Sequence, residues 1–181
     1  MGDGGLPLGN PQRSRVLRRP ASGRPDPARL DKVDHAILYA LSQDAELTNK
    51  ALARRLRLAE STCAYRLRSL RDRGIIRGTK IVIDPATLGF PLQAVIKVRL
   101  GSHTEQNVRT LYQQLIQVPS VLQVFHMAGA DDFLVHVAVA DAESLRDLVL
   151  RHITTHRVVR GTETHLVFDR RDGVGVTTER A

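Results

Sequence analysis

The sequence has almost no cysteine, since Cys63 is the only one in 181 residues. A disulfide within the chain and a zinc site built on several cysteines are therefore excluded. Tryptophan is absent and aromatic residues make up only 4% of the chain, so the core must consist mainly of aliphatic side chains. No apolar run is long enough to span a membrane and no stretch resembles a secretory signal, so we expect a cytoplasmic protein.

Lysine is also scarce, with four residues against 23 arginines, and the net charge of +8 is unevenly distributed. Residues 1–29 hold six arginines and two acids, and residues 30–78 hold ten basic and six acidic residues. Residues 79–181 hold eleven of each and are neutral. This asymmetry favours a segment that binds a polyanion, followed by a neutral module with a different role.

The first 29 residues contain five glycines and five prolines with almost no apolar periodicity. Such a segment cannot bury enough surface to offset the entropy lost on ordering, so we predict a disordered basic tail. Two roles for it stay open. It is either an arm that contacts nucleic acid or a solvated extension with no specific role.

Residues 30–78 contain three segments with helical periodicity. In the first, apolar residues recur from Val33 to Leu41. In the second, Thr48 is a suitable N-cap for "NKALARRLRL". The third, "STCAYRLRSLRDRG", carries four arginines and one acid, and Gly74 stands where the helix would end. The order of these segments predicts a helix-turn-helix domain over residues 30–78.

The third segment explains how one helix can be both buried and cationic. Cys63, Leu67 and Leu70 recur at helical spacing and would face the core, leaving the opposite side free for the DNA major groove. A solvated cationic face on a structural helix is the alternative. The residues expected to contact DNA bases or phosphates are Ser61, Thr62, Tyr65, Arg66, Arg68 and Ser69, with Lys50 and Arg54 from the preceding helix.

The second half of the chain alternates strand-like and helix-like patterns. After a linker strand and loop at residues 79–91, residues 92–169 have the order strand, helix, strand, strand, helix, strand. That order predicts a ferredoxin-like βαββαβ sandwich, so the fold class is α+β. Ser102 with Glu105, and Asp141, are expected to cap the two helices. Residues 170–181 are expected to form a loose C-terminal tail.

The two halves together resemble the Lrp/AsnC family of transcription regulators over about residues 30–169. The resemblance is carried by Leu30-Asp31, by Asp34 three residues later, by Gly74-Ile75-Ile76 and by Asp84-Pro85. It implies a homodimer joined through the C-terminal sheets and the linker strands, association of dimers to octamers, and a small effector such as an amino acid bound between dimers. It also implies a core helix-turn-helix motif at residues 49–68 and action on DNA of the nucleoid. Ala59 departs from the serine common at that position, and Ser61 is expected to cap the third helix instead.

The resemblance places an effector site at the turn Gly129-Ala130-Asp131-Asp132-Phe133. The Asp132 carboxylate would meet the ammonium of an amino acid, or it would only stabilise the turn. Further pocket residues implied by the family are Phe133, His165 and Leu166. Asp131 and His165 depart from the family pattern, and two neighbouring acids favour an effector with an additional positive charge, such as a basic amino acid.

Other function classes find less support. His152 and His156 have the spacing of a helical zinc pair, but "HITTH" lacks both the glutamate base and a third ligand. Siroheme decarboxylases resemble both halves of this fold, yet they would not need a cationic recognition helix. A stand-alone amino-acid sensor would not need one either. The sequence therefore favours a regulator that is not an enzyme and needs no metal or cofactor.

Overall fold

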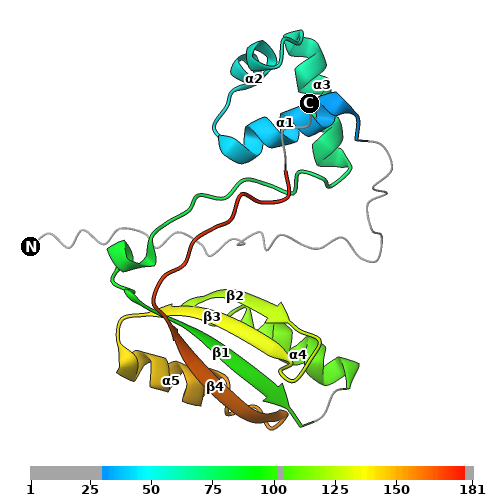
Figure 1. The fold of residues 1–181 in the computed structure, drawn as a ribbon. Helices are drawn as coiled ribbons and strands as arrows, with labels where there is room; N and C mark the ends of the chain where they lie inside the picture. The colour runs from blue at the N-terminus through cyan, green and yellow to red at the C-terminus, as the bar shows by residue number, and fades with distance from the viewer. Residues whose placement is uncertain (1–29, 102–103, 178–181) are drawn as a thin grey trace, which may run out of the picture. The chain divides into compact units, whose positions relative to one another are not determined.

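The computed structural model describes residues 30–101 and 104–177 (Figure 1). These residues form two compact units, one made of residues 30–81 with 173–177, the other of Val82–Asp172. The predicted basic tail at residues 1–29 lies outside the described residues. Each unit has its own hydrophobic core, in agreement with the two modules inferred from the charge distribution.

The first unit contains the three predicted helices, α1 (Lys32–Gln43), α2 (Asn49–Arg55) and α3 (Glu60–Asp72). Asp31 caps α1 by accepting a hydrogen bond from the backbone N–H of Asp34 at 2.8 Å. Thr48 caps α2, as predicted. Helix α3 ends at Gly74, whose φ of 69° is readily accessible to glycine, and the backbone N–H of Ile75 bonds to the carbonyl of Leu70 at 2.9 Å.

The three helices share one aliphatic core. Its buried members are Ile37, Ala40, Leu52, Ala53, Cys63, Leu67 and Leu70. Burying one leucine or isoleucine side chain contributes about 1.5–3 kcal/mol to the stability of the fold. The stability of this small core therefore depends on the apolar side chains of all three helices.

The linker differs from the prediction, because residues 75–84 form no strand within the single chain. A strand needs a partner for its backbone N–H and C=O groups, and none of the described segments pairs with this one. Ile81 and Val82 are left 82% and 83% exposed. Asp84 then caps a short 3-10 helix, η1 (Pro85–Leu88).

The second unit is a four-stranded antiparallel sheet with two helices. The strands are β1 (Leu92–Leu100), β2 (Val121–His126), β3 (Phe133–Val139) and β4 (Val159–Val167), arranged in the order β2-β3-β1-β4. This order and the intervening helices, α4 (Glu105–Leu115) and α5 (Ala142–His152), confirm the predicted ferredoxin-like fold.

Both helices pack on one face of the sheet (Figure 1). The core between them contains alternate residues of β1 and β3 and the apolar stripes of α4 and α5: Ala94, Ile96, Val98, Leu100, Phe133, Val135, Val137, Val139, Leu111, Leu115, Leu145 and Leu148. Asp141 caps α5, as predicted. Helix α4 is capped by Thr104, and the predicted cap Ser102 lies outside the described residues. His152, the last residue of α5, is exposed.

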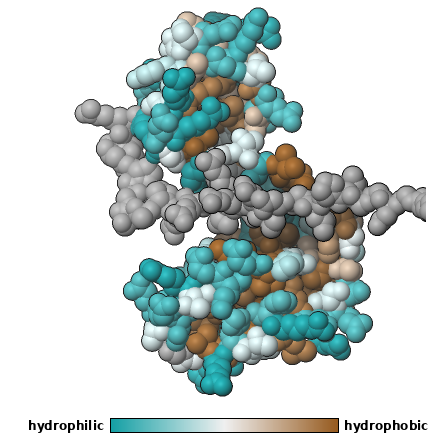
Figure 2. All heavy atoms as spheres, turned by 180° about the vertical axis from the view of Figure 1, so that it is seen from behind, coloured by the Kyte–Doolittle hydropathy of each residue, from teal (hydrophilic) through white to brown (hydrophobic). Residues whose placement is uncertain are grey.

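The opposite side of the sheet, here called the open face, carries the other alternate residues of the strands. Phe125 pairs with Leu134 on this face and is 48% exposed, whereas His136 is only 5% exposed. Figure 2 shows the molecule from behind relative to Figure 1, and hydrophobic residues reach the surface among hydrophilic ones in that view too. Exposed aliphatic and aromatic side chains of this size are typical of a surface that another chain covers.

Candidate DNA-binding and effector-binding sites

Helix α3 has the two faces that its sequence predicts. Cys63, Leu67 and Leu70 are buried, with exposed fractions of 0%, 8% and 0%. On the other side Tyr65 is 73% exposed, although it is a large aromatic residue. The predicted DNA contacts Ser61, Thr62 and Arg68 are also exposed, and Ser69 is half-buried beside them. Hydroxyl groups and a guanidinium on one helix face are suited to the donors and acceptors of the major groove.

The start of α3 differs from the prediction. The helix begins at Glu60 with Ala59 in the N-cap position, and no side chain caps it, so Ser61 lies inside the first turn. Asn49 at the start of α2 takes over part of the anchoring, because its Nδ2 donates to the carbonyl of Glu60 at 2.9 Å. This bond connects α2 to α3. A serine at position 59 would instead have capped α3 by bonding to a backbone N–H of the same helix.

The side chain of Arg66 does not project from α3 as predicted. Its Nη1 lies 2.6 Å from Asp31 Oδ2 and 2.9 Å from Asp34 Oδ1, and only 28% of the side chain is exposed. The hydrogen bonds that Arg66 donates to Asp31 and Asp34 raise the pKa of its guanidinium. The backbone N–H of Asp34 and then Arg66 lower the pKa of Asp31. Arg66 therefore joins α3 to the start of α1, and its guanidinium is directed to these two carboxylates rather than outward from the exposed face of α3.

Two cations of α2 lie close to the start of the recognition helix. Lys50 and Arg54 are exposed and line a surface hollow of about 480 Å³ that also includes Glu60 of α3. Cations beside a helix that enters a groove are placed to contact the flanking phosphates.

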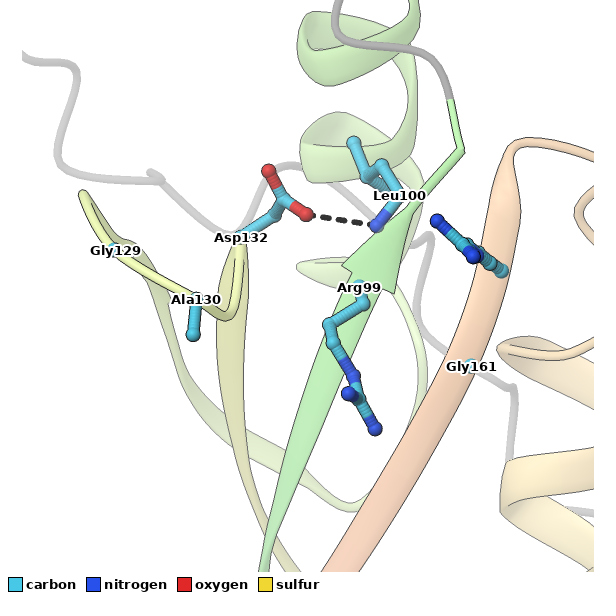
Figure 3. Close-up of a pocket in the computed structure, with 7 residues that line it drawn as sticks. Arg99, Leu100, Gly129, Ala130, Asp132 and Gly161 are labelled. Carbon is cyan, nitrogen blue, oxygen red and sulfur yellow. Dashed lines mark hydrogen bonds between the residues drawn. The ribbon is translucent and has the colours of Figure 1, made fainter.

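The predicted effector turn borders a cavity of about 510 Å³ in the second unit. The cavity is lined by Arg99, Leu100, Gly129, Ala130, Asp132, Arg160 and Gly161. Figure 3 shows the Gly129–Ala130 turn on one side of β1 and Gly161 of β4 on the other. The volume lies within the range of small-molecule pockets.

Asp132 stabilises the structure at the edge of this cavity. Its Oδ2 accepts a hydrogen bond from the backbone N–H of Leu100 at 2.7 Å, drawn in Figure 3. Its own N–H bonds to the carbonyl of Val98 at 2.9 Å. Asp132 thus connects the turn to the end of β1, and the same carboxylate lines the cavity. Both roles that the sequence left open are compatible with this position.

Three predicted effector residues do not line the cavity of this chain. Phe133 is fully buried in the core, with its ring 5.1 Å from that of His126. His165 pairs with Val95 and lies 3.0 Å from Glu163, and Leu166 pairs with Ala94. These two positions are toward the opposite end of β1 from Leu100, so a single chain does not bring them to Asp132.

The cavity residues that sequence reasoning missed are Arg99, Leu100, Arg160 and Gly161. The alternation of apolar and polar residues in β1 places the Arg99 side chain away from the core, but it does not identify a partner for that side chain. Arg160 comes to the cavity through an irregularity in the pairing of β4 with β1, and no residue pattern announces such an irregularity.

Other groups of the described residues show no separate chemistry. Cys63 is buried in the helical core, and burial raises the pKa of its thiol, which is unfavourable for a nucleophile. Within residues 30–101 and 104–177, no three His, Cys, Asp or Glu side chains gather in a way that would hold a metal ion. The same residues contain no helix that is long and apolar enough to cross a membrane.

Comparison with known protein families assigns both units. Residues 93–172 match the Lrp/AsnC ligand binding domain, and residues 30–77 match a winged helix-turn-helix DNA-binding domain. Together the two matches cover most of the described chain.

Individual relatives agree with this assignment. The chain is 44% identical over 153 residues to the HTH-type transcriptional regulator AldR of Mycobacterium tuberculosis, covering 84% of this chain and 86% of AldR. It is 32% identical over 126 residues to the DNA-binding transcriptional activator DecR of Escherichia coli, covering 70% and 83% of the two chains.

Solved structures show the same architecture. A crystal structure of MtbAldR superposes with a TM-score of 0.72 at 39% identity, covering 84% of this chain and 99% of that one. A transcriptional regulator of Neisseria meningitidis in complex with L-Met gives 0.72 at 28% identity, covering 84% and 97%. The chain therefore belongs to the Lrp/AsnC family and is a DNA-binding transcriptional regulator with an effector-binding domain, not an enzyme.

Proposed function

We propose that this regulator recognises its operator through the outward face of α3. The observation that carries the proposal is the exposure of Tyr65, at 73%, on a helix whose other face is fully packed. Tyr65 is accompanied by Ser61, Thr62, Arg68 and Ser69, and these five residues are the proposed contacts to base edges and nearby phosphates. Arg66 is not among them, because it is bound to Asp31 and Asp34.

Lys50 and Arg54 are proposed to bind phosphates beside the site that α3 enters. Both are exposed on α2 and lie next to the start of α3. Contacts of this kind supply affinity on every DNA sequence and make binding sensitive to salt. In this proposal the protein acts in the cytoplasm on the DNA of the nucleoid.

The proposed effector is an amino acid bound at the cavity that Gly129 and Asp132 border. The cavity size and its mixture of acidic and basic groups suit a small zwitterion. The relative in complex with L-Met supports an amino acid as the ligand class.

The proposed assembly is a homodimer that associates further to an octamer. Support comes from the exposed apolar side chains of the open face and from the linker, where Ile81 and Val82 expose both side chains and unpaired backbone. A second copy of the chain would give that backbone a partner. A dimer would place two α3 helices about 34 Å apart, so the operator is expected to be a palindrome with half-sites one turn apart.

A footprint on the DNA upstream of its own gene tests the proposal. The wild type should protect one or more palindromic sites. The Tyr65→Ala variant should lose about 1–3 kcal/mol of operator binding while its weak binding to random DNA changes little. Gln113→Ala, exposed on α4, is the matched control and should bind like the wild type. Equal losses on operator and random DNA would remove Tyr65 from sequence recognition.

Light scattering with each of the twenty amino acids tests the effector and the assembly. An effector acts only if it binds one assembly state more tightly than another, so it should shift the measured mass. A wild-type protein that is monomeric under all conditions would contradict the assembly proposal.

A further inference from the structure

A β-bulge interrupts the pairing of β4 with β1 beside the effector cavity. Arg99 pairs with Gly161, but the next residue of β1, Leu100, pairs with Val159. Arg160 is therefore the additional residue of the bulge. Bulges redirect side chains and are common beside binding sites, and this one brings the arginine to the cavity wall.

Glycine at position 161 keeps the space next to this arginine open. A Cβ atom added to Gly161 would meet nothing within 4 Å, so no neighbouring atom occupies the volume that a side chain would fill. Gly161 stands opposite Arg99 in the pairing, and both line the cavity with Arg160. The bulge and the glycine together leave room for a small group between two guanidinium-bearing side chains.

Arg160 differs from the other charged residues around the cavity in the contacts of its side chain. Asp132 accepts the N–H of Leu100 at 2.7 Å, and Asp131 Oδ1 lies 3.7 Å from Arg99 Nε. The side chain of Arg160 forms no hydrogen bond or ion pair with another described residue. It is thus the cation at this cavity that still lacks an anionic partner.

We propose that Arg160 binds the carboxylate of the effector, a role that rests on the proposed amino-acid site. A guanidinium forms two parallel hydrogen bonds to a carboxylate, which fixes the orientation of the ligand as well as its position. The ammonium of the ligand then lies toward the side of the cavity that Asp132 forms.

The same arrangement changes the expected class of effector. The sequence favoured a basic amino acid because Asp131 and Asp132 are adjacent, but Asp131 is paired with Arg99 and does not line the cavity. Asp131 is therefore not available to a second cationic group of the ligand, and a zwitterion with an uncharged side chain needs no further acid. The effector is therefore a neutral amino acid.

Calorimetry on the full-length protein tests the role of Arg160. The twenty L-amino acids are screened on the wild type, and the tightest ligand is compared with its α-carboxamide, which keeps the ammonium and the side chain but loses the carboxylate charge. The wild type should bind the acid about tenfold or more tightly than the amide. Arg160→Gln should bind the acid at least about tenfold more weakly, bind the amide unchanged, and so lose the preference.

Two further variants make the result specific. Arg160→Lys keeps the charge without the planar guanidinium and should retain part of the preference. Arg157→Gln, exposed just before β4 and outside the cavity lining, should behave as the wild type. Thermal melts of each variant verify that it is folded.

The outcomes separate the inference from the proposal on which it rests. Amino-acid binding with an undiminished preference for the acid in Arg160→Gln would overturn the role of Arg160 and leave the effector site intact. Tightest binding of a basic amino acid would overturn the effector class. Failure of all twenty amino acids to bind the wild type would overturn both this inference and the amino-acid site.

Discussion

The guanidinium of Arg66 donates to the carboxylate of Asp34 at 2.9 Å, and this bond joins the recognition helix to the first helix of the domain. The Asp34 side chain is only 9% exposed, whereas Arg66 is 28% exposed. A carboxylate that is nearly buried needs a partner, and Arg66 supplies it. Arg73 approaches the other oxygen of Asp34 at 3.9 Å. The position of α3 against α1 therefore depends on these ion pairs within the helical unit.

Replacement of Arg66 by alanine should destabilise the helical unit. Loss of the charged hydrogen bonds to Asp31 and Asp34 leaves a nearly buried carboxylate with only the more distant Arg73 close by. Because Arg66 is partly solvent-exposed, we expect a cost of about 1–2 kcal/mol, below that of breaking a fully buried pair. Chemical denaturation of the full chain measures the change.

The DNA affinity of the same variant distinguishes a structural from a base-contacting role. Under native conditions Arg66→Ala should weaken operator and random DNA by the same factor, because it alters the orientation of the whole helix. Arg68→Ala, on the exposed side of α3, is the matched control and should leave stability within about 0.5 kcal/mol of the wild type. A selective loss of operator binding in a fully stable Arg66→Ala protein would restore Arg66 to the base contacts.

The helices of the DNA-binding unit were predictable because their signals are local. Thr48 caps α2 through its side-chain oxygen, and Gly74 follows the end of α3 with a backbone bond to Arg71. The spacing of Cys63, Leu67 and Leu70 defines the buried face. The direction of Arg66 was not predictable from spacing. It depends on Asp31 and Asp34, which are more than thirty residues away in the sequence and come close only when α1 and α3 pack.

The effector cavity in the sheet unit also depends on contacts between distant residues, which sequence spacing does not predict. The turn at Gly129 and Asp132 was found through the family resemblance, and Gly129, with a φ of 145°, is a local signal for it. The bond from Asp132 to Leu100 joins residues 32 apart in the sequence and was not predicted. Arg160 was missed because a bulge is a property of two paired strands and not of one. The linker at Ile81 and Val82 was predicted as a strand from composition, yet strand formation requires a partner that the single chain lacks.

Arg54→Ala should weaken binding to all DNA sequences by a similar factor. Arg54 is exposed on α2 beside the start of α3, where a phosphate contact adds affinity without reading a base. The logarithm of the affinity falls with the logarithm of the salt concentration. Between about 50 and 200 mM salt this slope should be smaller than that of the wild type by about one counterion. An unchanged slope would mean that Arg54 does not contact a phosphate.

Deletion of residues 1–28 should lower the affinity for every DNA sequence and leave the preferred sequence unchanged. The deleted segment carries five arginines, which can neutralise phosphates without contacting bases. Selection of binding sites from a random pool, performed with the full and shortened chains, gives both quantities. A different consensus for the shortened chain would indicate instead that the tail reads the minor groove.

Phe125→Lys should disrupt assembly through the open face. Phe125 is 48% exposed and pairs with Leu134 on the side of the sheet that no helix covers. A lysine placed there would be desolvated by a partner chain, so the mass measured by light scattering should fall toward that of the monomer. Leu150→Lys on α5, at a residue 53% exposed, is the control and should keep the wild-type mass. If both variants assemble normally, the open face is not the dimer interface.

His136 should make the stability of the sheet unit depend on pH near neutrality. Its side chain lies on the open face, 5% exposed, with Nε2 3.0 Å from Gln93 Oε1. Burial, and next the positive charge of Arg170, lower the pKa of His136 below its ordinary value of 6.5.

The sign of the effect follows from the protons bound in each state. Below about pH 6.5 the unfolded chain takes up a proton at this histidine while the folded chain resists it, so stability falls as the pH drops. Above about pH 7 both states are neutral at this position and the full stability is present. The loss stops growing once the pH is below the folded-state pKa. Melting temperatures between about pH 5 and 8 should therefore decline on the acid side for the wild type and decline less for His136→Gln. The exposed His152→Gln variant should follow the wild-type profile, and identical profiles for all three proteins would show that His136 is not the group that titrates.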